Sequence, residues 1–119
     1  RGAASCVFVD SGAGAIRTIR ENLGKTGLWE RSRVVRADLR RGAVTGGPFD
    51  LAFLDPPYAF PGAALRRVLG EAVERLAPGG TMVLTRPARS SIDVVPVDWR
   101  VVKRLAYGDT LVLVCREAP

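Results

Sequence analysis

Short apolar runs alternate with apolar stripes of helical spacing along the chain. Three of the runs are brief and are followed by polar or turn residues, a pattern that predicts β-strands. These runs are residues 5–9, 33–36 and 51–54.

Two segments carry apolar residues on one side of a helix, one between the first two runs and one after the third. In residues 13–24, Ile16, Ile19 and Leu23 recur at helical spacing, with charged residues between them. The second helix is the clearest element, and Pro78-Gly79-Gly80 is expected to end it. Its apolar stripe consists of Leu65, Val68, Leu69, Ala72, Val73 and Leu76.

The last third of the chain is rich in strand-forming residues. A strand is predicted over 81–85, and the runs 99–107 and 110–115 flank Gly108-Asp109, which predicts a hairpin. Strands that alternate with helices predict an α/β fold, in which helices cover an open, mostly parallel sheet. The hairpin adds an antiparallel strand at its edge. Without a linker or a repeat, residues 1–119 are expected to form a single domain.

Composition narrows the function classes. The 119 residues carry a net charge of +6, mostly from arginine, which favours a polyanionic partner such as nucleic acid. The sequence has no histidine and no Cys-x-x-Cys motif, which excludes a zinc site and catalysis by a Ser-His or Cys-His pair. Cys6 and Cys115 lie in apolar runs and are expected to be small buried hydrophobes, as in a protein of the reducing cytoplasm. No apolar run is long enough for a membrane span.

Acidic residues stand at the ends of three predicted strands. Asp10 and Asp55 directly follow apolar runs, and Asp38 lies just after the run 33–36. In open α/β sheets ligands bind at the carboxyl ends of the strands. The three carboxylates are therefore expected to meet at one site.

The stretch VFVDSGAGA offers a competing interpretation. A strand followed by Asp-x-Gly-x-Gly is typical of a dinucleotide- or cofactor-binding turn. The third glycine of that motif is missing, since Ile16 and Arg17 stand in its place. We therefore expect Gly12 and Gly14 to open the helix, with Asp10 ending the second strand of the complete fold.

Residues 51–58 read LAFLDPPY, an apolar strand followed by an acid, two prolines and an aromatic residue. The prolines stop sheet pairing and hold a stiff turn whose carbonyls are expected to stay free. Asp55 adds a second acceptor, and Tyr58 offers a face for stacking a planar ring. Together they predict a pocket for the exocyclic amine of a nucleobase, which would attack an electrophilic methyl group once its hydrogens are accepted.

Asp55, Pro56, Pro57 and Tyr58 resemble motif IV of the amino-group methyltransferases that use S-adenosylmethionine. The chain as a whole is similar to the bacterial small-subunit (16S) ribosomal RNA guanine-N2 methyltransferases, which have a Rossmann-like fold. The segments that carry this resemblance are RGAASCVFVD, IRTIRENL, RVVRAD, PFDLAFLDPPY, LAPGG and VDWRVVKRLAYGDTLVLV.

The resemblance assigns roles to the candidate residues. It implies that Asp10 holds the ribose hydroxyls of S-adenosylmethionine, and that Ala37, Asp38 and Leu39 bracket the adenine. Asp55, which borders the cofactor, and the three residues after it would hold the target guanine as catalytic residues. The implied partner is ribosomal RNA or the small ribosomal subunit. The protein is expected to be a monomer that binds no metal and no membrane.

Two features depart from the family pattern. The first strand and its glycine-rich turn have no counterpart, so the domain is expected to be truncated at its amino end. The loop after residue 85 reads TRPARSS where an acidic residue is expected. Arg86 and Arg89 in that loop are expected to be solvated, with contact to RNA phosphate as the alternative.

Other functions stay open. The Asp-Pro-Pro-Tyr motif also suits a DNA methyltransferase acting on adenine N6 or cytosine N4, although no target-recognition domain is evident. A protein-glutamine methyltransferase usually has Asn in place of Asp55. A non-catalytic nucleic-acid-binding module would retain the fold alone, and a dinucleotide oxidoreductase would need a genuine glycine turn after Asp10.

Overall fold

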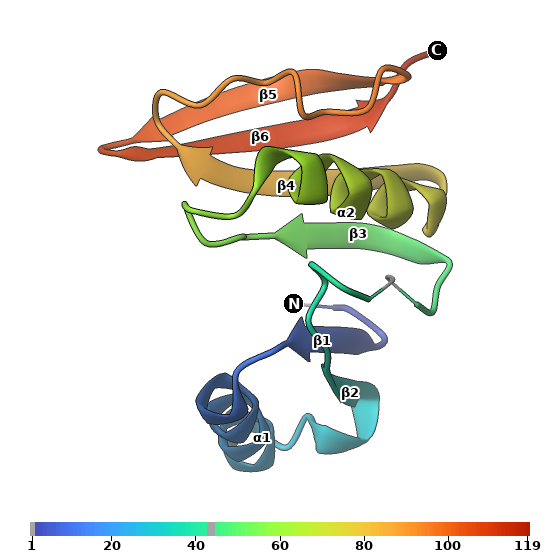
Figure 1. The fold of residues 1–119 in the computed structure, drawn as a ribbon. Helices are drawn as coiled ribbons and strands as arrows, with labels where there is room; N and C mark the ends of the chain where they lie inside the picture. The colour runs from blue at the N-terminus through green and yellow to red at the C-terminus, as the bar shows by residue number, and fades with distance from the viewer. Residues whose placement is uncertain (1, 43–44) are drawn as a thin grey trace. The chain divides into compact units, whose positions relative to one another are not determined.

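The structure is a computed structural model that describes residues 2–42 and 45–119. It divides into two compact units, Arg1–Gly42 (unit 1) and Ala43–Pro119 (unit 2), and Figure 1 shows the elements of each. Each unit has its own sheet, and each is described by itself.

Unit 1 is a βαβ arrangement. Its elements are β1 (Cys6–Asp10), α1 (Ala13–Thr26), the short 3₁₀ helix η1 (Trp29–Arg31) and β2 (Ser32–Arg36). The two strands pair in parallel, from Cys6 opposite Ser32 to Asp10 opposite Arg36. The predicted strands and helix of this region are confirmed.

The apolar stripe of α1 faces inward as predicted. Ile16 and Leu23 are buried, while Arg17 and Arg20 are exposed. The expectation that the strand over 5–9 is buried is wrong, and so is the expectation for Cys6, which is exposed. Within unit 1 one helix packs on a sheet of two strands, and this is too little structure to cover both faces of β1.

Unit 2 is a four-stranded sheet with one helix. Its elements are β3 (Phe49–Leu54), α2 (Gly62–Glu74), β4 (Leu76–Pro87), β5 (Trp99–Tyr107) and β6 (Thr110–Glu117). The strand order is β3-β4-β6-β5, with β3 and β4 parallel and β6 antiparallel to both of its neighbours. Three strands therefore run in one direction and β6 runs in the other. The predicted α/β fold with an antiparallel terminal hairpin is confirmed.

The core of unit 2 lies between α2 and one face of the sheet (Figure 1). Leu65 and Leu69 of α2 pack on side chains of β4 and β6, and Val94 of the loop before β5 joins them. The strand residues are Met82, Leu84, Leu111, Leu113 and Cys115. Cys115 is buried as predicted, and burial raises the pKa of its thiol.

The second face of β3 is not covered within unit 2. The strand over 51–54 was expected to be buried, but Leu51 and Phe53 are 48% and 74% exposed. β3 is the edge strand of this sheet, and α2 covers the face that carries Ala52 and Leu54. Because side chains alternate along the strand, Leu51 and Phe53 point to the face that α2 does not cover.

The helix α2 ends earlier than predicted. Its last residue is Glu74, and Leu76 already belongs to β4, so Pro78-Gly79-Gly80 does not terminate it. The Arg75 N–H donates to the Ala72 carbonyl (3.0 Å), and the Arg75 carbonyl accepts from the Phe49 N–H (2.8 Å). The helix thus ends next to Arg75, whose carbonyl bonds the first residue of β3.

The hairpin turns at Gly108 and Asp109, as the sequence predicts. Gly108 has φ +57°, a left-handed conformation that suits glycine, and Tyr107 pairs with Thr110 across the turn. Neither helix among residues 2–42 and 45–119 has the length and apolar character needed to cross a bilayer.

Candidate active site

Residues Asp55–Tyr58 leave the sheet directly after β3. Asp55 and Tyr58 are exposed, and Pro56 is half-buried. The Phe60 N–H donates to the Pro57 carbonyl (2.9 Å), which closes a turn just before α2 begins. The prediction that both proline carbonyls stay free is therefore wrong for Pro57. The Pro56 carbonyl has no internal hydrogen-bond partner within the described ranges, so it remains an acceptor for a ligand.

The carboxylate of Asp55 has no hydrogen bond and no ion pair within residues 2–42 and 45–119. It stands one residue past the end of β3, where the backbone no longer pairs with β4. An exposed carboxylate without internal partners keeps its full capacity to accept hydrogen bonds. Asp55 and the Pro56 carbonyl are thus two consecutive acceptors available to one donor group.

Tyr58 is anchored at its hydroxyl end. Its Oη lies 3.3 Å from Oγ1 of Thr110, the first residue of β6, and its side chain is largely open. β4 lies between β3 and β6 in the sheet, so this contact bridges the carboxyl end of β4. Thr110 belongs to the YGDT segment that contributed to the family resemblance. No role for Thr110 was predicted from the sequence, and only the sheet order brings it to Tyr58.

Asp10 ends β1 and shapes the entrance of α1. Its Oδ1 accepts from the Gly12 N–H (2.7 Å), and its carbonyl accepts from the Ala37 N–H (3.0 Å). No internal partner is recorded for Oδ2 in the part of the chain that the structure describes. One oxygen therefore fixes the turn, and the other is available for hydroxyl donors such as those of a ribose.

Asp38 is held by Arg40, a residue that the sequence analysis did not single out. Its Oδ1 accepts from the Arg40 N–H (3.0 Å) and Nε (3.1 Å), and its Oδ2 accepts from Nη2 (3.1 Å). These hydrogen bonds hold the pKa of Asp38 below its usual value. Oδ2 keeps one lone pair, enough to accept from a single amine N–H.

The carboxyl ends of β1 and β2 bring the predicted cofactor residues of unit 1 together. Asp10 is opposite Arg36, and the half-buried residues Ala37, Asp38 and Leu39 follow. The acceptors left on Asp10 and Asp38 match the hydroxyl and amine donors of an adenosine. Asp55–Tyr58 lie in unit 2, so the expected meeting of all three acids stays a prediction.

Gly12 and Gly14 open α1, as the sequence predicts. Gly12 has φ −82°, and its carbonyl accepts the first helical bond from Ile16 (3.0 Å). A Cβ on Gly14 would meet no atom within 4 Å. Neither position has a positive φ or the close backbone approach that requires glycine. This geometry favours a helix start over a dinucleotide turn.

Three comparisons place the chain among known proteins. A family model described as Conserved hypothetical protein 95 matches residues 1–116. The ribosomal RNA large subunit methyltransferase K/L of Chromohalobacter salexigens is 34% identical over 120 residues, which cover 91% of this chain. The chain spans 16% of that relative's length.

The chain belongs to the Conserved hypothetical protein 95 family.

Solved structures agree with this family at the level of the fold. The protein described as "putative methyltransferase yhhF" from Escherichia coli has a TM-score of 0.83 at 18% identity, covering 98% of this chain and 66% of its own. The S-adenosylmethionine-dependent methyltransferase SibL has a TM-score of 0.69 at 14% identity, covering 97% and 44%. The family member described here therefore has the α/β fold of the S-adenosylmethionine-dependent methyltransferases.

Arg86 differs from its expected solvated state. It lies inside β4, and its Nε and Nη1 atoms are buried without a hydrogen-bond partner in the part of the chain that the structure describes. Arg89 is exposed, as expected. The side-chain pattern around position 86 did not indicate this, because it follows from the place of Arg86 at the end of a central strand.

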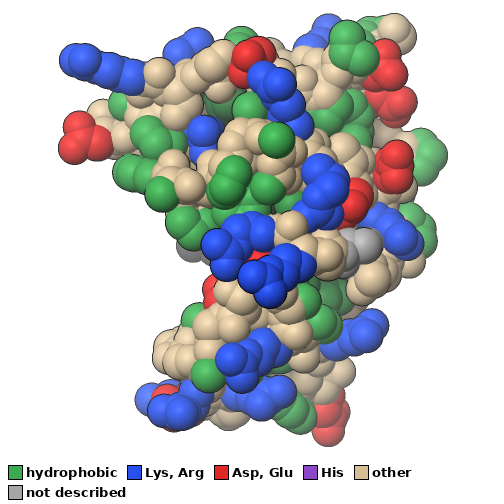
Figure 2. All heavy atoms as spheres, viewed as in Figure 1, with side chains coloured by type: hydrophobic (Ala, Val, Ile, Leu, Met, Phe, Trp, Pro, Cys, Tyr) green, Lys and Arg blue, Asp and Glu red, His purple; other side chains and the backbone are tan. Residues whose placement is uncertain are grey.

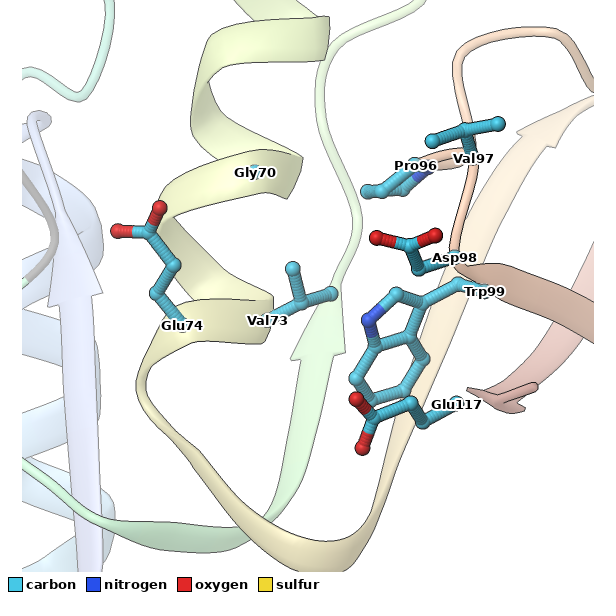
Figure 3. A pocket seen from close by; sticks show the side chains of 8 residues that line it. All are labelled: Gly70, Val73, Glu74, Pro96, Val97, Asp98, Trp99 and Glu117. Atoms are coloured by element: carbon cyan, nitrogen blue, oxygen red, sulfur yellow. The ribbon is translucent and has the colours of Figure 1, made fainter. Parts of the chain in front are cut away.

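An open pocket in unit 2 lies away from Asp55. Figure 3 shows it between the last turn of α2 and the start of β5, with a volume of about 350 Å³. It is lined by Gly70, Val73, Glu74, Pro96, Val97, Asp98, Trp99 and Glu117. Because β4 and β6 are antiparallel, Glu117 marks the amino end of β4, opposite the end that carries Arg86. Three carboxylates there would repel a phosphate chain, so this cavity does not suit a nucleic acid.

Outside this pocket, the surface charge suits an anionic partner. Figure 2 shows basic side chains predominating over acidic ones on the visible face. No group of three or more His, Cys, Asp or Glu side chains within the described residues has an arrangement that could hold a metal ion.

Proposed function

We propose that this protein transfers a methyl group from S-adenosylmethionine to the exocyclic N2 amine of a guanine in ribosomal RNA. The observation that carries the proposal is the pair of unpartnered acceptors, the Asp55 carboxylate and the Pro56 carbonyl, directly after β3 and beside the exposed ring of Tyr58. The methyltransferase fold supplies the context for this geometry.

The cofactor would bind through unit 1. The free Oδ2 of Asp10 would accept from the ribose hydroxyls, and the remaining lone pair of Asp38 would accept from the adenine amine, flanked by Ala37 and Leu39. When bound, S-adenosylmethionine supplies an electrophilic methyl group on a sulfonium.

The chain's own residues would prepare the guanine. Tyr58 stacks on the extruded base, and Asp55 and the Pro56 carbonyl each accept one N–H of the amine. Both bonds would favour a pyramidal nitrogen and expose its lone pair to the methyl group that S-adenosylmethionine would supply. The surplus proton leaves the nitrogen towards Asp55 and from there reaches water.

Support for RNA comes from two directions. The relative from Chromohalobacter salexigens is a ribosomal RNA methyltransferase by name, and the chain carries a net charge of +6. That relative is named for the large subunit, whereas the resemblance of the YGDT and Asp-Pro-Pro-Tyr segments points to the small subunit. We propose the small subunit, met by a monomer in the cytoplasm.

The test is methyl transfer to unmodified ribosomal RNA. Transcripts of both subunit RNAs, free and reconstituted into particles, are incubated with labelled S-adenosylmethionine and digested to nucleosides. We expect N2-methylguanosine in small-subunit RNA. Asp55→Ala should lower the rate by about 10² to 10³-fold, in the range seen when one preorganised polar group is removed.

The matched control is Asp50→Ala, which removes an exposed carboxylate from the same strand. It should leave the rate within about twofold of the unchanged protein, as expected for a surface substitution. Methylated adenine or cytosine in DNA would instead identify a DNA methyltransferase. RNA binding without methyl transfer to any substrate would identify a binding module and contradict the proposal.

A further inference from the structure

Arg86 is a charged residue in a row of core side chains. Met82 and Leu84 of β4 are buried against α2, and Arg86, two residues on, follows them on the same face of the strand. Its cross-strand neighbour is Leu111, which is also buried. The guanidinium nitrogens Nε and Nη1 are buried and have no hydrogen-bond partner among the described residues.

This arrangement is costly without a ligand. A guanidinium stays protonated at any physiological pH, and buried polar groups in folded proteins are nearly always hydrogen-bonded. An aliphatic residue at position 86 would continue the apolar row and avoid the cost of burying an unpaired charge. The arginines in ion pairs within residues 2–42 and 45–119 are Arg40, Arg66 and Arg67, so none of these pairs involves Arg86.

Arg86 lies at the same end of the sheet as the candidate catalytic residues. β3 and β4 are parallel with Leu54 opposite Leu84, so Asp55 and Arg86 both lie just past that pair. On the other side, Thr110 pairs with Pro87, the residue after Arg86, and Thr110 contacts the hydroxyl of Tyr58. The Tyr58–Thr110 contact therefore spans the strand end that carries Arg86.

We propose that Arg86 binds a backbone phosphate of the substrate RNA next to the target guanine. The inference rests on the proposed function, because a nucleotide turned out of a helix brings its phosphate with it. Nη2 is not among the buried nitrogens, so a phosphate can approach it. A phosphate bound at Nη2 would offset the guanidinium charge whose Nε and Nη1 atoms are buried.

Binding of RNA at several salt concentrations tests the proposal. The full chain, Arg86→Gln and Arg86→Lys are titrated with a labelled single-stranded RNA that contains guanine. Arg86→Gln should weaken binding about tenfold, and the slope of log affinity against log salt should fall in magnitude by about 0.7, as for one lost phosphate contact. Arg86→Lys should keep the slope, because it keeps the charge.

Arg66→Gln is the matched control. Arg66 is an exposed arginine of α2 that already pairs with Asp93 (3.1 Å), so its loss should change neither the affinity nor the slope. If Arg86→Gln behaves like Arg66→Gln, the proposal is wrong.

Thermal unfolding separates ligand binding from a structural role. Without RNA, Arg86→Gln should unfold about 4 °C or more above the unchanged protein, since it removes an unpaired buried charge. A lower unfolding temperature would show that Arg86 has an internal partner and would overturn the proposal. Stabilisation of the unchanged protein by 10 mM inorganic phosphate to the same extent as by RNA would identify a free-phosphate site instead.

The methyl-transfer assay distinguishes failure here from failure of the proposed function. If Asp55→Ala abolishes transfer while Arg86→Gln binds RNA as the unchanged protein does, only the role of Arg86 falls. If the unchanged protein neither binds RNA nor transfers methyl, both proposals fall.

Discussion

At the residue scale, the candidate residues are oxygen acceptors, and only some of them have hydrogen bonds within the chain. Oδ1 of Asp10 holds the Gly12 N–H, and Arg40 occupies most of the Asp38 carboxylate. These internal bonds fix each side chain and leave a defined acceptor for a ligand. Asp55 is different, because no internal bond within residues 2–42 and 45–119 holds its carboxylate.

Variants of Tyr58 and Thr110 can separate the role of the Tyr58 ring from the role of its hydroxyl. Tyr58→Ala removes the stacking face and should lower kcat/KM about 10- to 100-fold, since stacking on an aromatic side chain contributes about 1–3 kcal/mol per base. Tyr58→Phe and Thr110→Val each remove only the contact at 3.3 Å and should cost less than tenfold. Steady-state kinetics of RNA methylation measures all three.

A double variant checks whether the two residues act together. If both single variants lose activity because they lose the Tyr58–Thr110 contact, the double variant Tyr58→Phe with Thr110→Val should be no slower than either of them. Additive losses would show that the two hydroxyls act independently. Equal losses for Tyr58→Phe and Tyr58→Ala would contradict a stacking role for the ring.

At the scale of elements, α2 and the central strands of unit 2 carry the core on which the Asp-Pro-Pro-Tyr turn is built. Leu69 is fully buried and packs among Met82, Leu84 and their neighbours. The turn lies between β3 and the first residue of α2, so the packing of α2 fixes one of its two ends.

Truncating Leu69 should unfold unit 2 more readily. Leu69→Ala leaves a cavity in a close-packed core and should lower the free energy of unfolding by about 2–5 kcal/mol. Val97→Ala is the control, since Val97 is 95% exposed and its truncation should change stability by less than about 0.5 kcal/mol. Urea titration of both variants measures the difference, and equal midpoints would contradict the core assignment.

At the scale of the whole molecule, burial is uneven between the two units. Ile16 and Leu23 are the buried hydrophobic residues of unit 1 within residues 2–42, and the rest of the core belongs to unit 2. A unit with few buried apolar side chains opens at lower free energy than one with a full core. The proposed cofactor residues Asp10 and Asp38 lie in the unit with the smaller core.

Hydrogen exchange should reveal this difference. Without ligand, backbone amides of β1, α1 and β2 should exchange faster than those of β4 and β6, because local opening follows the buried core. S-Adenosylmethionine should slow exchange most in unit 1, whereas NAD should not. Protection that appears first in β4 and β6 would contradict cofactor binding through Asp10 and Asp38.

The sequence determined the elements, because apolar spacing reflects local geometry. The runs around β1, β2 and β3, the stripe of α1 and the Gly108-Asp109 turn were all predictable from side-chain order. The turn after β3 was equally predictable, since proline restricts the backbone wherever it stands. The end of α2 was misplaced because a hydrogen bond from Phe49, distant in sequence, decides it.

Tertiary structure decided which residues that are distant in the sequence become neighbours. The order β3-β4-β6-β5 puts β6 between β4 and β5, and only this order brings Thr110 to Tyr58 and leaves Nε and Nη1 of Arg86 buried at the end of a central strand. The same order makes β3 an edge strand and exposes Phe53, which its apolar run did not foretell. Strand pairing and burial depend on contacts between residues far apart in the chain, and side-chain spacing within one segment carries no record of them.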